Sequence, residues 1–322
     1  MTIAHCIAMV APFVLICAGG ATGQTKDVIE SETAPPKLVM LVYQRFPFDK
    51  ATESGKALAA AARACANLEV PNSWIVLESA TGDSEVLSFD PFDSFAHIGK
   101  AFARWGPIYA AHAELGKFQA QINGALASQR TIVAERRDDL SYRANRIDLS
   151  KPRFLRVLEV RLHPGHEGEF TEASKMLTAA YEKKKSDLPW VVYQVNVGMS
   201  SPTFFAFVPM RSLAQNDDLL NLRDVLHEAE GEGAERMQQI ARAAYAHTES
   251  NLYAISPEKS HVSKEFAAGD PEFWTPKPPA PKKAAARGGL PVIRPRLALT
   301  ARIDDYIVRT ARNRALPSAT RS

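Results

Sequence analysis

The chain has 322 residues, of which 46% are hydrophobic and 23% are charged, a composition typical of a globular protein long enough for two average domains. The net charge of +3 is unevenly distributed, because residues 277–322 carry 11 basic and two acidic side chains while the rest of the chain is mildly acidic. A nucleic-acid-binding domain would place its basic patch on the folded part of the chain, so we expect no nucleic-acid partner.

The N-terminal region has the features of an export signal. Its first 24 residues contain no Lys, Arg, Asp or Glu, and the apolar run from Ile7 to Ala18 is followed by small residues. This run is shorter than the roughly 20 apolar residues that span a bilayer. We therefore expect residues 1–24 to be a cleaved signal peptide and the protein to be periplasmic or extracellular, with an uncleaved anchor or a misassigned start as the alternatives. After cleavage only Cys65 would remain, as a buried thiol without a disulfide.

Residues 25–36 are polar, end in a Pro pair and predict a linker. Residues 37–143 then form a first structural unit with a regular order of elements. Apolar runs, helix formers and turn residues predict a strand at 38–46, a helix at 54–68, strands at 74–79 and 85–89, a helical region at 93–128 and a strand at 130–135. Pro107 lacks the amide hydrogen that a helix needs, so a break at Gly106-Pro107 is expected.

Residues 144–263 repeat the same order. The predicted elements are a strand at 154–162, a helix at 169–185, strands at 190–197 and 203–208, a helical stretch at 213–247 and a strand at 251–255. Leu38 precedes Trp74 by 36 residues, and Phe154 precedes Trp190 by 36 residues. The pattern predicts an α+β fold of two tandem ferredoxin-like repeats. Each repeat alone would leave one sheet face open, so we expect the two antiparallel sheets to pack face to face.

The turn after the fifth predicted strand carries a resemblance to a known family. The run from Leu162 to Phe170, a strand end, a Pro-Gly turn and an acidic helix start, resembles the dimeric α/β-barrel superfamily, which includes the antibiotic-biosynthesis monooxygenase-like proteins. The resemblance covers residues 37–256 in architecture and implies an intrachain dimeric α/β barrel. Members include oxygenases, haem enzymes, isomerases and proteins without known chemistry, so no activity is carried over.

The last segment, residues 264–322, is rich in Pro and Arg and predicts a disordered tail. Its positive charge would allow weak contact with anionic envelope surfaces.

Strand alternation predicts where a ligand would bind. Side chains two apart share a face, and on the first two strands of each repeat apolar residues are followed by polar ones. If these faces point into the barrel, the candidate ligand-binding residues are Tyr43, Arg45, Trp74, Glu78, Glu159, Arg161, Trp190, Gln194 and Asn196. The two arginines would favour an anionic or carbonyl-bearing ligand. The alternative is that Arg45–Glu78 and Glu159–Arg161 are structural ion pairs.

Three functions are compatible with these residues. The first is an exported protein, monomer or homodimer, that binds a small molecule in the barrel interior without clear catalytic machinery. The second is a cofactor-free monooxygenase or isomerase acting on a small aromatic or carbonyl compound. There Arg45 or Arg161 would stabilise an oxyanion, and Tyr43, Glu78 or Glu159 would move a proton.

The third function is haem binding through His112 or His247. His163 and His166 flank a Pro-Gly turn that need not bring their rings together, so no metal is predicted and no cofactor is assigned. The nucleophile elbow, the phosphate loop and the dinucleotide glycine motif are absent from the sequence.

Overall fold

The computed structural model describes residues 33–220 and 232–275. The predicted signal peptide, most of the predicted linker and residues 276–322 of the predicted tail lie outside this part of the chain. The first repeat contains β1 (Leu38–Arg45), α1 (Ala51–Asn67), β2 (Ile75–Ser79), β3 (Glu85–Phe92), α2 (Phe95–Ala111), α3 (Ala113–Ala125) and β4 (Ser128–Arg136). The second contains β5 (Phe154–Leu162), α4 (Glu167–Lys183), β6 (Val191–Val197), β7 (Thr203–Met210), α5 (Gln215–Leu220), α7 (Glu232–Ala244) and β8 (Tyr245–Ile255). No helix among the described residues has the length and apolarity that crossing a membrane requires.

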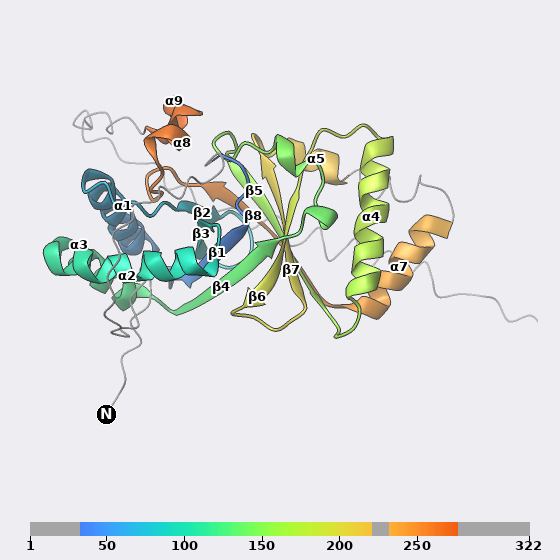
Figure 1. Ribbon diagram of the computed structural model, residues 1–322, viewed down its shortest axis with the longest axis horizontal. Helices are drawn as coiled ribbons and strands as arrows, with labels where there is room; N and C mark the ends of the chain where they lie inside the picture. Colours follow the sequence, from blue (N-terminus) through green and yellow to red (C-terminus); the bar gives the residue numbers. More distant parts are fainter. Residues whose placement is uncertain (1–32, 221–231, 276–322) are drawn as a thin grey trace, which may run out of the picture. The chain divides into compact units, whose positions relative to one another are not determined.

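The eight strands form one closed antiparallel barrel in the order β1-β3-β2-β8-β5-β7-β6-β4 (Figure 1). Each repeat contributes a four-stranded sheet, β4-β1-β3-β2 from the first and β8-β5-β7-β6 from the second. The two sheets join where β2 pairs with β8 and where β4 pairs with β6. Closure satisfies the backbone groups of all four outer strands, which would otherwise be open edges. The predicted α+β fold and the intrachain dimeric α/β barrel are confirmed.

Helices cover the outside of each sheet. In Figure 1, α1, α2 and α3 lie beside the first sheet, and α4 and α7 lie beside the second. Trp105 of α2 and Leu115 of α3 pack on Trp74 and Val76, whereas Phe170 of α4 packs against the outer side of the second sheet. Both faces of both sheets are therefore apolar over much of their area, as expected for covered sheets.

The middle of the barrel is a solid aromatic core. Phe89 lies edge-on to Tyr193 and to Phe207, at centroid distances of 6.3 Å and 5.8 Å, and Phe205 packs on Phe207 at 6.2 Å. These rings fill the space between the sheets. The barrel interior can accommodate a ligand at its two ends and not at its centre.

Two helical predictions differ from the structure. Helix α2 continues through Pro107 and ends at Ala111, because the buried Ile98, Ala101 and Trp105 hold it on the sheet and outweigh the lost hydrogen bond. The predicted helix at 213–247 is wrong from Tyr245 onward, where β8 begins. Its first residues pair with β5, so tertiary pairing overrides local helix propensity there.

The predicted start of the disordered tail, at residue 264, lies too early in the chain. Two short helices, α8 (Lys264–Ala268) and α9 (Pro271–Trp274), bury Phe266 and Trp274 against the barrel core. The Trp274 indole donates a hydrogen bond of 2.8 Å to the Ser150 carbonyl, and Asp270 is 2.5 Å from Arg153. Two aromatic side chains within 12 residues are enough to anchor this segment.

Candidate functional site

One end of the barrel holds a small polar cavity of about 190 Å³, which we call the barrel chamber. It lies where β1 and β5 end and where β3 and β4 begin. Its apolar floor is formed by Ile132, Val157, Met199 and Phe205. Its polar and charged wall residues come from both repeats: Tyr43, Arg45, Glu85, Ser128, Gln129, Arg130, Glu159, Glu249, Asn251 and Tyr253.

A buried carboxylate organises one side of the chamber. The side chain of Glu85 is 6% exposed, and it accepts hydrogen bonds from the Tyr253 hydroxyl at 2.5 Å and from Arg45 Nε at 3.2 Å. Arg45 also reaches Asp83, with 2.9 Å between Nη2 and Oδ2. Burial, followed by the hydrogen bond to Glu85, raises the pKa of Tyr253. Two carboxylates therefore engage Arg45 and offset its positive charge.

The other side of the chamber presents groups that have no partner within the described part of the chain. Neither the Tyr43 hydroxyl nor the Glu159 carboxyl makes a hydrogen bond or ion pair with a described residue. Burial, followed by the charges of Glu85 and Glu159, raises the pKa of Tyr43. Burial also raises the pKa of Glu159. A hydroxyl and a carboxyl that share one small cavity can together donate and accept hydrogen bonds.

The structure brings three of the predicted site residues together. Tyr43, Arg45 and Glu159 line the barrel chamber, as the alternation on β1 and β5 indicated. Arg161 lies two residues further along β5, pairs in register with Thr203 and His247, and does not line the chamber. Asn196 is exposed near the end of β6.

The predicted faces of the second strands are wrong. Trp74 packs on α2, and Glu78 pairs with Lys259 outside the barrel. Trp190 stacks on Tyr142, and Gln194 accepts a hydrogen bond from Arg137. The inward positions of these strands are instead Ile75, Leu77, Val191, Tyr193 and Val195. Helices cover the outer face, so both faces of β2 and β6 are apolar and alternation alone does not distinguish them.

Seven of the ten polar wall residues of the chamber were missed from the sequence, among them Glu85, Glu249 and Tyr253. Glu85 and Tyr253 lie at inward positions of β3 and β8, and Glu249 lies on a part of β8 between the predicted helix, which ended at 247, and the predicted strand, which began at 251. Applying the same alternation to the third strand would have identified Glu85. The position of Glu249 depends on the pairing of β8 with β5, for which the sequence carries no local signal.

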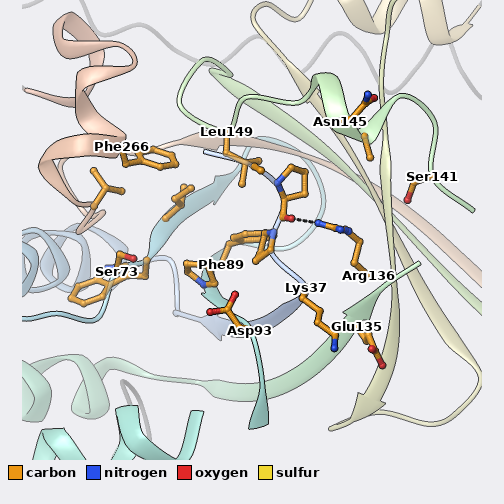
Figure 2. Close-up of a pocket in the computed structure, with 18 of the residues that line it drawn as sticks. Lys37, Ser73, Phe89, Asp93, Glu135, Arg136, Ser141, Asn145, Leu149 and Phe266 are labelled. Atoms are coloured by element: carbon orange, nitrogen blue, oxygen red, sulfur yellow. Dashed lines mark hydrogen bonds between the residues drawn. The ribbon is translucent and has the colours of Figure 1, made fainter. Parts of the chain in front are cut away.

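A larger pocket of about 1050 Å³ lies at the opposite end of the barrel, where β1 begins and β4 ends (Figure 2). Ile75, Phe89, Leu149 and Phe266 form its apolar part, and Lys37, Asp93 and Glu135 lie at its rim. Arg136 pairs with Asp138 at 2.7 Å and donates to the Pro35 carbonyl. This pocket is large enough for a drug-sized ligand, but the two arginines that line it, Arg136 and Arg143, are both engaged within the protein.

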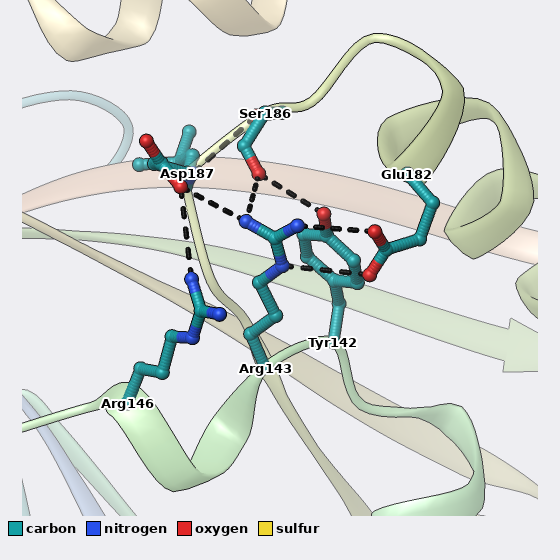
Figure 3. Close-up of polar contacts among 7 residues, drawn as sticks. Tyr142, Arg143, Arg146, Glu182, Ser186 and Asp187 are labelled. Carbon is teal, nitrogen blue, oxygen red and sulfur yellow. Dashed lines mark hydrogen bonds and ion pairs between the residues drawn. The ribbon is translucent and has the colours of Figure 1, made fainter.

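The second of these arginines, Arg143, belongs to a structural network between the two repeats (Figure 3). Its guanidinium contacts Glu182 at 3.0 Å and Asp187 at 2.9 Å and donates to the Ser186 carbonyl. The Tyr142 hydroxyl donates to the same carbonyl at 3.0 Å. The network ties the inter-repeat segment to the end of α4 and leaves the arginine no group for a ligand.

The described histidines do not form a cofactor site. No group of three His, Cys, Asp or Glu side chains in the described residues could hold a metal ion, and the His163 and His166 rings lie 6.3 Å apart. His112 lies between α2 and α3 and faces Glu114, while His247 lies on β8. Neither lines the barrel chamber or the larger pocket, and His247 lies beside an open pocket of about 400 Å³ with Arg242 and Tyr245.

No protein-family model matches the chain, and no curated protein matches it. Among solved structures, an anthrone oxidase-like protein is similar with a TM-score of 0.47 and 14% identity, covering 68% of this chain and 91% of that one. A mutant chlorite dismutase from Candidatus Nitrospira defluvii has a TM-score of 0.42 and 10% identity, covering 70% and 92%. A haem-binding protein from Thermus thermophilus has a TM-score of 0.40 and 11% identity, covering 70% and 97%. These TM-scores and sequence identities are too low to assign an activity to this chain. The fold assignment rests on the strand order of the barrel.

Proposed function

We propose that the protein binds a small molecule in the barrel chamber, and that the ligand carries a neutral or cationic hydrogen-bond donor. The observation that carries this proposal is the pair formed by the Tyr43 hydroxyl and the Glu159 carboxyl, which have no partner among the described residues. The chamber lining holds three carboxyl groups, Glu85, Glu159 and Glu249, and two guanidinium groups, Arg45 and Arg130. Arg161 and His247 lie outside the lining and partly offset the charge of Glu159. The charge balance thus supports a cationic or neutral ligand over an anion.

The choice of the chamber over the larger pocket rests on chemistry. A functional site combines a cavity with convergent polar groups whose pKa values are perturbed, and the chamber has Tyr43, Glu159 and Tyr253 in this state. The larger pocket is lined by charges that are paired within the protein or lie at its rim.

The test uses three compounds of nearly the same shape: benzamidine, which is cationic, benzamide, which is neutral, and benzoate, which is anionic. Isothermal titration calorimetry should show that benzamidine and benzamide bind while benzoate does not. Tyr43→Phe and Glu159→Gln should each weaken binding about tenfold or more, since one hydrogen bond to a charged group contributes about 1.5–3 kcal/mol. Glu78→Gln, a change on the outside of the barrel, is the matched control and should leave the affinity unchanged. Preferential binding of benzoate, or equal affinity in all variants, would refute the proposal.

A second candidate is proton transfer at a small carbonyl compound. The raised pKa of Glu159 supports it, because a general base works best when its pKa lies near the working pH. An active enzyme would exchange the hydrogen next to the carbonyl of acetylacetone for deuterium faster than buffer does. Glu159→Gln should remove that excess exchange without lowering the melting temperature. An equal rate in both proteins would leave binding as the function.

We also propose export, since the apolar N-terminal run has the length and flanking residues of a signal peptide. N-terminal sequencing of protein recovered from cells should give a start near residue 25, and an intact Met1 would refute cleavage. The proposed partner is a small molecule. Closure of the barrel within one chain leaves no strand edge for a second copy among the described strands, and light scattering distinguishes monomer from homodimer.

A further inference from the structure

A third cavity, which shares Ser73 and Trp74 with the lining of the larger pocket, lies between the first sheet and its helices. It is bounded by the helix-facing side chains of β1, β2 and β3, by α1 and α2, and by the loop before β2. Its volume is about 30 Å³. It shares no lining residue with the barrel chamber, which lies on the opposite face of the same sheet.

Two buried polar atoms in this cavity have no hydrogen-bond partner among the described residues. One is a donor, Nε1 of Trp105, whose residue is 3% exposed, and the other is an acceptor, Oδ1 of Asn72. Both residues line the cavity. A buried donor or acceptor left without a partner costs about 1–3 kcal/mol, so native proteins normally satisfy such groups with protein or ordered water.

The other tryptophans show that Trp105 is exceptional. The indole nitrogens of Trp74, Trp190 and Trp274 donate to backbone carbonyls at 3.0 Å, 3.1 Å and 2.8 Å. These three and Trp105 are all the tryptophans of the chain. Trp74 also lines the cavity, but the indole nitrogen of Trp105 is the one of the four that has no hydrogen-bond partner among the described residues.

A carboxyl group lines the same cavity. Asp90 lies on the helix-facing side of β3 and accepts a hydrogen bond from the Ser88 hydroxyl. Burial raises its pKa to about 7. No other ionisable side chain lines the cavity: Cys65 of α1 packs beside it without lining it, and His97 of α2 faces Phe92 and Asp93. Asp90 is therefore the one lining group of this cavity that gains or loses a proton.

We propose that this cavity is a binding site for ordered water, in which about two water molecules accept from Trp105 Nε1, donate to Asn72 Oδ1 and contact the Asp90 carboxyl. The volume accommodates this number, because one water needs about 10–15 Å³ of such space. The polar atoms supply the two to four hydrogen-bond partners that a buried water requires. With no cationic side chain at the site, the occupant is neutral, and the charge of Asp90 sets the orientation of its hydrogen bonds.

The test is nuclear magnetic resonance of the intact protein with ¹⁵N-labelled tryptophan. The indole signal of Trp105 is the test group, and the signals of Trp190 and Trp274, which do not line the cavity, are the internal controls. The Trp105 signal, assigned by its loss in Trp105→Phe, should show cross-relaxation with long-lived water, and the signals of Trp190 and Trp274 should show none. The Trp105 signal should also shift with pH, with a midpoint near neutral pH, and this shift should vanish in Asp90→Asn.

Two results would overturn the proposal. Absence of water cross-relaxation at Trp105, at the level of the Trp190 and Trp274 controls, would mean that the cavity is dry. A pH-dependent shift that persists in Asp90→Asn would mean that Asp90 does not govern the site. Because the water measurement is made on the unaltered protein, a variant that fails to fold does not affect it. Trp105 can then be assigned by elimination with Trp74→Phe, Trp190→Phe and Trp274→Phe.

Discussion

The sharpest prediction concerns Asp90 and the pH dependence of stability. Burial raises its pKa from 3.8 to about 7 in the folded protein. Between these two pH values the folded state keeps a proton that the unfolded state releases, so the free energy of unfolding falls as pH rises and levels off above about pH 7. Each pKa unit corresponds to 1.36 kcal/mol, so this group removes up to about 4 kcal/mol of stability between pH 4 and pH 7.

Asp90→Asn replaces the carboxyl with a neutral group of the same shape and should abolish this slope. At pH 8 the variant should be more stable than the unaltered protein by about 2–4 kcal/mol, the lower figure allowing for a weakened hydrogen bond with Ser88. At pH 4 the two should be nearly equal. Urea unfolding at intervals from pH 4 to pH 8.5 measures the difference, and subtraction cancels the titration of all other groups.

The control for this experiment is Asp49→Asn, which changes an exposed side chain in the same way. It should give a difference close to zero at every pH. If the free-energy difference between Asp90→Asn and the unaltered protein stays constant from pH 4 to pH 8.5, Asp90 titrates as it would in the unfolded chain and the reasoning is refuted.

Three further predictions test the chamber, the barrel and the C-terminal segment. Glu85→Gln should lower the free energy of unfolding by about 2–3 kcal/mol, because it weakens charge-assisted hydrogen bonds to Arg45 and Tyr253; an unchanged urea midpoint would contradict this. Gly198→Ala should destabilise by more than 1 kcal/mol, since Gly198 has φ of +100° and a Cβ there would lie 2.3 Å from the Thr131 carbonyl oxygen. Gly99→Ala, with open space around it on α2, should instead raise the free energy of unfolding by up to about 1 kcal/mol. If both variants are less stable than the unaltered protein, the effect does not depend on the conformation or surroundings of Gly198. Trp274→Ala should cost about 3–5 kcal/mol if the segment after residue 263 belongs to the fold, and a melting temperature equal to that of the unaltered protein would place it outside.

Part of the candidate site could be predicted because β1 and β5 carry their own signal. On these strands the inward face changes from apolar to polar along its length, which correctly placed Tyr43, Arg45 and Glu159 in one cavity. The ion-pair partner of Arg45 was mispredicted as Glu78, although Glu85 lies opposite it in the register of β1 and β3. Partners across a sheet depend on the strand order, and the four outer strands pair in a way that no local pattern specifies.

The amino-acid sequence by itself determined the repeat, and with it the fold, because equal spacing between equivalent strands reflects the period of one structural unit. It also determined the existence of the strands, since runs of β-branched and aromatic residues form strands whichever of their two faces points into the barrel. Only the tertiary structure decided which face of β2 and β6 points inward, because helices outside and a second sheet inside make both faces apolar. The same holds for Asp90: its pKa depends on how completely the surrounding side chains exclude water, and those side chains come from strands and helices far apart in the chain.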